Sequence, residues 1–155
     1  MICLFESVCI LIISILQFGL TLFGGVVPGT EVYWLINILN AFIVMGAILM
    51  TIGASVSKFL VACVGSYIVI ATTIVLLLCC VGLFLWIMCD RSSFEDYITL
   101  HCKVQGVACE FHSIYTYLTS VGVVSMLFYC AFLIFSWTAL RCFKYNKTIN
   151  MKIKK

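Results

Sequence analysis

The chain has 155 residues, of which 65% are hydrophobic and 10% are charged, and its formal net charge is +3. A soluble domain usually has about 45–50% apolar and about 25% charged residues, so a water-soluble fold of this length cannot bury so much apolar surface. The composition therefore excludes a soluble globular domain and predicts one compact domain whose solvent is mostly lipid. The positive charge does not indicate nucleic-acid binding, because the basic residues are concentrated near one membrane face.

Four apolar runs are long enough to cross a membrane as helices. They cover about residues 7–27, 33–53, 59–88 and 117–140. A hydrocarbon core of about 30 Å requires about 20 residues at the helical rise of about 1.5 Å per residue. The third run is longer and must tilt or project beyond the bilayer. The sequence therefore predicts an all-α membrane protein, in which residues 1–155 form a single bundle of four transmembrane helices.

Basic residues predict which side of the membrane each end of the bundle faces. With four spans both termini share one side, and that side would hold seven of the nine basic residues: Lys58, Arg141, Lys144, Lys147, Lys152, Lys154 and Lys155. Because basic residues near span ends favour the cytoplasm, we expect both termini and the basic tail 141–155 to be cytosolic. The cysteine-containing loop 89–116 would then be extracellular or lumenal. Asn146 begins a glycosylation sequon, which the same topology predicts to be unused.

Three amide side chains lie within the predicted spans. Gln17 belongs to the first, and Asn37 and Asn40 share one face of the second because they are three residues apart. We expect interhelical hydrogen bonds from them, each contributing about 0.6–2 kcal/mol. A permeation path would favour ionisable groups at mid-depth, and the spans have none there. Small residues that mark expected packing faces are Gly46, Gly53, Ala62 and Ser66.

The loop between the third and fourth spans contains three cysteines, Cys89, Cys102 and Cys109. On an extracytoplasmic loop paired cysteines usually form disulfides. We favour Cys102 with Cys109, since the short segment between them contains a glycine, but the two pairings with Cys89 stay open. Zinc bound by both histidines of the loop, His101 and His112, together with Cys102 and Cys109 is the alternative. It is disfavoured because adjacent His101 and Cys102 are awkward ligands for one tetrahedral ion.

Three further cysteines lie near the face that is expected to be cytosolic: Cys3, Cys9 and Cys142. Juxtamembrane thiols on that face are candidates for palmitoylation. The residues that flank Cys142, Arg141 and Phe143, favour acylation there. For Cys9 an unmodified buried thiol is an equal alternative, because free cysteines within a bundle behave as small apolar residues.

The first two spans resemble those of sarcospan and the membrane-spanning four-domains subfamily A tetraspans. The similarity is carried by "ILQFGLTLFGGVV" and "VYWLINILNAFIVMGAIL", within residues 10–49. The family characteristically has a glutamine followed by glycines in its first span, and an aromatic-Trp pair and a later glycine in its second. The matching residues here are Gln17, Gly19, Gly24, Gly25, Tyr33, Trp34 and Gly46. The resemblance implies a non-catalytic partner protein that organises laterally associated membrane complexes.

The residues and the resemblance together predict a scaffold or accessory subunit rather than an enzyme. The sequence offers no His/Asp/Glu constellation for catalysis, and we expect no cofactor and no metal. The expected partners are lipids, other integral membrane proteins and further copies of the chain, with no nucleic acid. The expected location is the plasma membrane. The alternative function is a channel-forming or transporter-accessory oligomer.

Overall fold

The computed structural model describes residues 2–23, 31–105 and 111–153, which form five α-helices. Their bounds are α1 Ile2–Phe23, α2 Glu31–Ser55, α3 Phe59–Cys89, α4 Arg91–Gln105 and α5 Phe111–Ile153. Four of them hold an apolar stretch long enough to cross a membrane: Cys3–Leu22, Glu31–Ser55, Phe59–Cys89 and Thr119–Asn146. The predicted all-α bundle of four membrane-spanning helices is confirmed.

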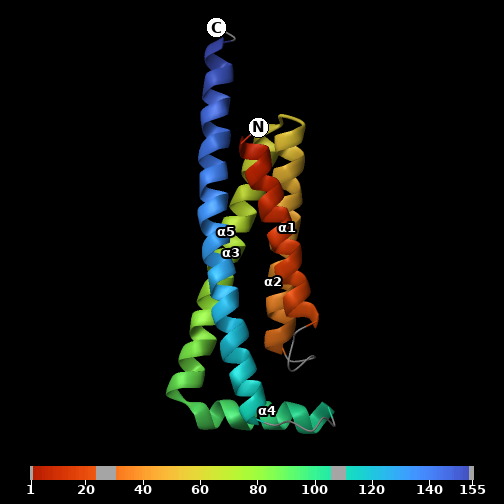
Figure 1. The fold of residues 1–155 in the computed structure, drawn as a ribbon, viewed down its shortest axis with the longest axis vertical. Helices are drawn as coiled ribbons and strands as arrows, with labels where there is room; N and C mark the ends of the chain where they lie inside the picture. Colours follow the sequence, from red (N-terminus) through yellow and green to blue (C-terminus); the bar gives the residue numbers. More distant parts are fainter. Residues whose placement is uncertain (1, 24–30, 106–110, 154–155) are drawn as a thin grey trace.

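The four long helices form a ring in which each contacts two neighbours. α1 packs against α2 and α5, and α3 packs against the same two helices from the other side. Neighbouring helices run in opposite directions, so Ile2 and Ile153 lie at the same end of the molecule (Figure 1). That end also holds Lys58, Arg141 and Lys144, and we call it the basic end. We call the opposite end, where α4 lies, the α4 end.

Glycines allow α2 and α3 to pack closely near the basic end. A Cβ atom on Gly46 would stand 2.8 Å from the side chain of Val69 and 3.0 Å from the carbonyl oxygen of Gly65. On Gly53 it would collide with the backbone of Ala62. Small side chains let helix backbones approach in lipid, where dispersion contacts between helices replace the hydrophobic effect. The sharp turn from α2 to α3 passes through Ser57, a non-glycine residue with a φ of 57°.

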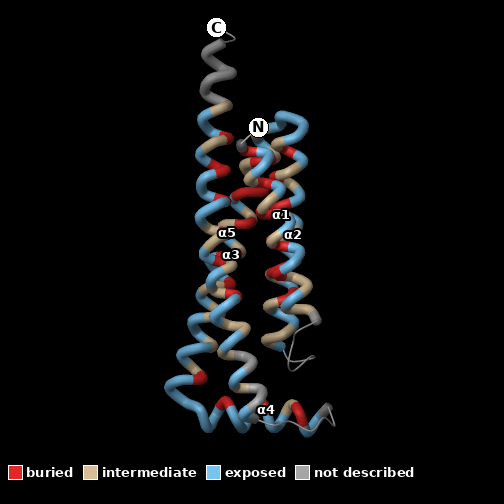
Figure 2. The backbone as a smooth tube through the Cα atoms, viewed as in Figure 1, coloured by how far each residue is buried: buried red, intermediate tan, exposed pale blue. Residues whose placement is uncertain are grey.

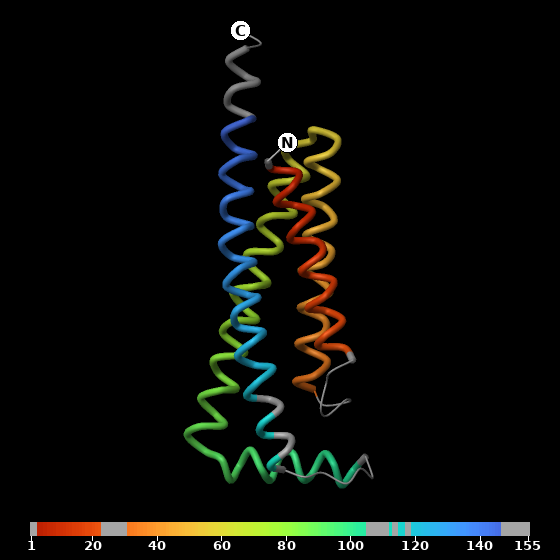
Figure 3. The backbone as a smooth tube through the Cα atoms, in the orientation of Figure 1, coloured from red at the N-terminus to blue at the C-terminus, as the bar shows by residue number. Residues whose placement is uncertain are grey.

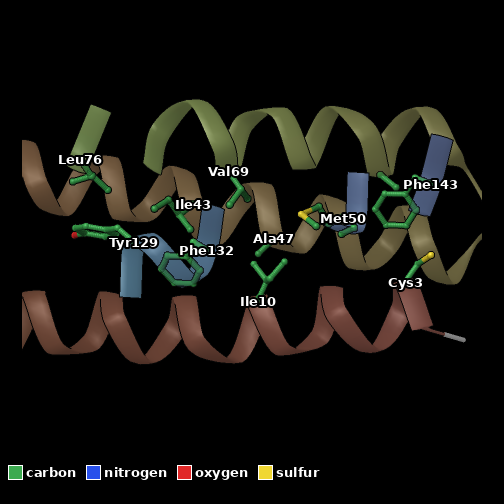
Figure 4. Packing of buried hydrophobic residues seen from close by; sticks show 12 residues of the cluster. Cys3, Ile10, Ile43, Ala47, Met50, Val69, Leu76, Tyr129, Phe132 and Phe143 are labelled. Carbon is green, nitrogen blue, oxygen red and sulfur yellow. The ribbon is translucent and has the colours of Figure 1, made fainter. Parts of the chain in front are cut away.

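Buried apolar side chains fill the bundle toward the basic end. Figure 4 shows Ile10 of α1, Ala47 of α2, Val69 of α3 and Phe132 of α5 pointing into the same interior. All four are fully buried. Figure 2 shows that most buried positions of the four long helices lie in this half. The packed core therefore ties all four spans together at the basic end.

Helix α4 lies across the opposite end of the bundle, and Figure 3 shows that α3 extends further toward it than α1 or α2 does. Its apolar side chains Phe94 and Ile98 pack with Ile87 of α3 in a small core of their own, and Trp86 stacks edge-on against Phe94 at 5.4 Å. The joint between α3 and α4 is the single residue Asp90. Such a short joint holds α4 against the end of α3.

Helix bounds differ from the expected spans in three places. Helix α1 begins at Ile2, ahead of the expected first span, and its first turn is tied to α5 through the buried Cys3, which is bonded to Cys142. The expected loop 89–116 contains α4, and the expected tail 141–155 continues α5 without a break to Ile153. The absence of glycine and proline from 123–155 removes the residues that usually end a helix.

Candidate functional site

The candidate site is a group of neutral polar side chains inside the bundle, which we call the polar cluster. Its members come from three helices: Gln17 and Thr21 of α1, Asn37 and Asn40 of α2, and Ser125 and Tyr129 of α5. Each pair of residues on one helix is three or four positions apart, so both members point to the same face. The cluster lies at the edge of the apolar core, on the side toward α4.

Hydrogen bonds in the cluster join the three helices. Gln17 Nε2 donates to Ser125 Oγ at 3.0 Å, which links α1 to α5. Thr21 Oγ1 donates to Asn37 Oδ1 at 3.2 Å, which links α1 to α2. The Tyr129 hydroxyl lies 3.4 Å from Asn40 Oδ1, a long contact between α5 and α2. Each of the six side chains therefore has a partner on another helix, which lowers the cost of placing it in the membrane.

One acceptor of the cluster lacks a partner. Gln17 is 1% exposed, and its Oε1 atom has no hydrogen-bond partner among the described residues. Two hydroxyls deeper in the core, those of Thr73 on α3 and Ser136 on α5, are fully buried and share this property. An unpaired buried polar atom is costly, about 1–3 kcal/mol each, so these three atoms lower the stability of the bundle interior.

The chemistry of the cluster suits binding rather than reaction. Its six side chains are amides, aliphatic hydroxyls and one phenol, and none is a carboxylate or an imidazole that titrates near neutral pH. Among the residues that the structure describes, no group of three or more His, Cys, Asp or Glu side chains is placed to hold a metal ion. The three amides expected from sequence are thus brought together. Thr21, Ser125 and Tyr129 were not identified, although Thr21 follows Gln17 by one helical turn.

The cysteines near α4 are placed as follows. Cys102 on α4 is disulfide-bonded, and Cys89 at the end of α3 is a free, exposed thiol. The expected partner of Cys102, Cys109, lies outside the described residues. The ring of His101 donates from Nδ1 to the carbonyl oxygen of Tyr97, one turn earlier on α4, at 3.0 Å. A disulfide at Cys102 is incompatible with its service as a thiolate ligand in the alternative zinc site.

A second disulfide joins the first helix to the last. Cys3 and Cys142 are 139 residues apart in sequence, and their Cα atoms lie 6.2 Å from each other. This pair corrects the expectation that both are palmitoylation candidates, because a sulfur in a disulfide cannot carry a thioester. The two cysteines lie at the same level along the bundle, at the basic end, because α1 begins at Ile2 and α5 continues past Arg141. Cys9 remains a free, half-buried thiol.

The two disulfides lie at opposite ends of the bundle. Cys3–Cys142 belongs to the basic end, and Cys102 belongs to α4. Disulfides persist in oxidising compartments and are rare in the cytosol. A membrane that borders the cytosol therefore exposes one of the two disulfides to reducing conditions, whichever way the chain is inserted.

Comparisons with protein-family models, curated proteins and solved structures found no match to this chain.

Proposed function

We propose that this chain is a non-enzymatic accessory or scaffold protein that organises complexes of other integral membrane proteins. The observation that carries the proposal is that the interior polar groups form hydrogen bonds to one another between helices. Gln17, Ser125, Thr21 and Asn37 bond to one another across helices, and the apolar core beside them is packed. A bundle held together in this way is a rigid framework, and its outer faces remain available for contacts with other integral membrane proteins.

The outer faces carry large apolar side chains suited to lipid or to the helices of another membrane protein. Leu78 on α3 and Leu127 on α5 are 66% and 67% exposed, so two different helices of the ring present a large apolar side chain outward. The resemblance of the first two spans to the sarcospan-like tetraspans supports the same role. The plasma membrane as location and cytosolic termini belong to this proposal. A glycan on Asn146 in cells would contradict that orientation.

Photo-cross-linking tests the role directly. Leu78 or Leu127 is replaced by photo-leucine in the full chain in cells, with photo-leucine at the fully buried Leu76 of α3 as the matched control. A scaffold gives cross-links to a defined set of integral membrane proteins from at least one outward position and none from Leu76. Cross-links confined to lipid at both outward positions would overturn the proposal.

The alternative, a channel-forming or transporter-accessory oligomer, gives a different result in the same experiment. Cross-links from the outward positions would join copies of the chain to one another. Purified protein in liposomes would also conduct ions or small solutes without any added partner. A scaffold conducts nothing by itself.

A further inference from the structure

Helix α4 divides its side chains between two opposite faces. At about 100° per residue, the polar exposed residues between Phe94 and Val104 fall within one sector of the helix, which we call the charged face: Glu95, Asp96, Thr99 and Lys103. The remaining residues of this segment form the apolar face: Phe94, Tyr97, Ile98, Leu100, His101, Cys102 and Val104. A helix with this division lies between water and an apolar phase.

Only part of the apolar face packs against the bundle. Phe94, Ile98 and Cys102 are at most 4% exposed. Leu100 and Val104, one turn apart on the flank of the same face, are 60% and 79% exposed. Among the described residues, α4 contacts α3 and α5 but neither α1 nor α2. Two large apolar side chains of α4 are therefore left uncovered by the bundle.

The ends of two spans define the level at which α4 lies. The apolar span of α3 ends at Cys89, and α4 begins at Arg91. The apolar span of α5 begins at Thr119, one helical turn after Tyr115, whose ring centre lies 5.1 Å from the guanidinium carbon of Arg91. Figure 1 shows α4 lying across this end of the bundle. Helix α4 therefore lies where the apolar length of its two neighbours ends.

Aromatic and apolar side chains mark the same level as a membrane–water boundary. The ring of Trp86 on α3 lies 5.4 Å from that of Phe94 and 5.5 Å from that of Tyr97. Tryptophan and tyrosine are enriched at such boundaries, because their rings are apolar and carry one polar group. Leu85 and Met88, in the last turns of α3, are 55% and 60% exposed. The outward apolar surface of α3 thus continues to the start of α4.

Lipid is the occupant that these observations select for the uncovered side chains. The charged face is turned away from the apolar face, so water on the first places the bilayer against the second. A second protein chain is a poor fit, because a stable interface takes about 800 Å² from each partner and only two side chains are available here. The charged residues of α4 are two acids and two bases: Arg91, Glu95, Asp96 and Lys103. Without an excess of positive charge, α4 has no preference for anionic headgroups.

We propose that α4 is an interfacial helix that inserts Leu100 and Val104 among the lipids of the leaflet on the α4 side. The acyl chains and the glycerol region of these lipids are its ligand, and the charged face stays in water. Because Phe94 and Ile98 hold α4 to α3, the inserted side chains fix the depth of the bundle in the membrane. This role does not depend on the proposed scaffold function.

Photo-cross-linking at three consecutive residues tests the proposal. Ile98, Thr99 or Leu100 is replaced by photo-leucine in the full chain, and each protein is reconstituted in phosphatidylcholine liposomes, irradiated and mapped by peptide mass spectrometry. The three positions carry the same diazirine toward the bundle, toward water and toward the expected lipid contact. Cross-links from Ile98 to α3 verify that α4 is seated as in the structure, since both Ile98 and Ile87 are buried in one cluster.

The proposal expects at least about fivefold more lipid adduct from Leu100 than from Thr99, because the apolar face of an interfacial helix lies at the acyl boundary and the opposite face lies in water. Photo-leucine at Val104 should give the same result as at Leu100. Equal lipid yields from Thr99 and Leu100 would overturn the proposal. Cross-links from Leu100 and Val104 to a second copy of the chain, in place of lipid, would overturn it as well and assign the face to self-association.

Discussion

The carbonyl oxygen of Gly46 on α2 lies 2.6 Å from the position that a Cβ atom on Gly65 of α3 would occupy. The backbone nitrogen of Met50 lies equally close to that position. Both neighbours are main-chain atoms, which cannot rotate away as the end of a flexible side chain can. The two helices are therefore in backbone contact, and this contact requires glycine at residue 65.

Replacement of Gly65 with alanine should destabilise the bundle. The added methyl group must push α2 and α3 apart, and insertion of extra atoms into a packed core usually costs about 1–3 kcal/mol. Thermal unfolding of the purified protein in detergent measures the change as a lowered Tm. The control is Gly82→Ala on the same helix, where the new Cβ meets no atom of the described residues within 4 Å. Equal Tm values for the two variants would contradict close packing at Gly65.

The contact between Tyr129 and Asn40 should contribute a small but measurable stability. Tyr129→Phe removes the hydroxyl that lies 3.4 Å from Asn40 Oδ1 and keeps the ring. Hydrogen bonds between membrane helices contribute about 0.6 kcal/mol on average, so a loss near this value is expected from reversible unfolding. Tyr145→Phe, on the same helix at a 68% exposed position, is the matched control and should be neutral. A loss at Tyr129→Phe no larger than that at Tyr145→Phe would show that the contact between Tyr129 and Asn40 contributes no stability.

Much of the fold follows from the sequence because lipid imposes simple rules. Apolar run length predicts the four spans, and the glycines of α2 predict its packing face. The pair Asn37 and Asn40 could be placed on one face from spacing alone. Their partners could not, because the identity of a facing residue such as Tyr129 depends on the vertical register between α2 and α5. The residue pattern within a single helix gives no information about the register between two helices.

Two other features lay beyond sequence reasoning for a related reason. Residues 91–105 mix four charged side chains with six hydrophobic ones, so their hydropathy indicates a loop. Their helix depends on the burial of Phe94 and Ile98 against Ile87. The pairing of Cys3 with Cys142 requires that α1 begins at Ile2 and that α5 continues past Leu140, the expected end of the fourth span. The residues that flank Cys142, Arg141 and Phe143, indicated a lipid-modified thiol instead.

The joint between α3 and α4 should respond to acid through Asp90. Its carbonyl oxygen accepts the first hydrogen bond of α4, from Phe94, and its Oδ1 accepts from Ser92 Oγ and from the Ser93 backbone N–H at 3.2 Å. This is the geometry of a helix N-cap. The side chain and backbone of Ser93, and then the side chain of Ser92, lower the pKa of the Asp90 carboxyl from its ordinary value.

A lowered pKa fixes the direction of the pH effect. The stabilisation of the start of α4 is fully present above the ordinary aspartate pKa of about 3.9, and it is lost as the pH falls through the lower pKa of the folded state. Protection of the Ser93 amide against hydrogen exchange, corrected for the intrinsic rate, should fall over that acidic range. Asp90→Asn retains a capping oxygen without a titratable group, so its protection should not change with pH. The same pH dependence in Asp90→Asn would rule out Asp90 as the source.

The Cys3–Cys142 disulfide should be the strongest single link between α1 and α5. In the chain-entropy model, closure of a loop of 100 residues contributes about 4.7 kcal/mol, and this loop spans 139 residues. The contribution in a membrane should be smaller, because spans that separate stay inserted and explore fewer conformations than an unfolded soluble chain. Cys142→Ser should therefore lower the Tm of the oxidised protein, and a thiol reductant should lower the wild-type Tm to the same value.

Cys9→Ser supplies the matched control, since it removes a free thiol from the same helix as Cys3. Its Tm should equal that of the wild type and should fall on reduction in the same way. Cys142→Ser should be insensitive to the reductant, apart from any effect of the bond at Cys102, which Cys102→Ser measures separately. Rapid alkylation of intact cells, followed by peptide mapping without reduction, then tests the bond in its own compartment. Complete alkylation of both Cys3 and Cys142 would show that the basic end lies on a reducing side and that the two helices are held there by packing alone.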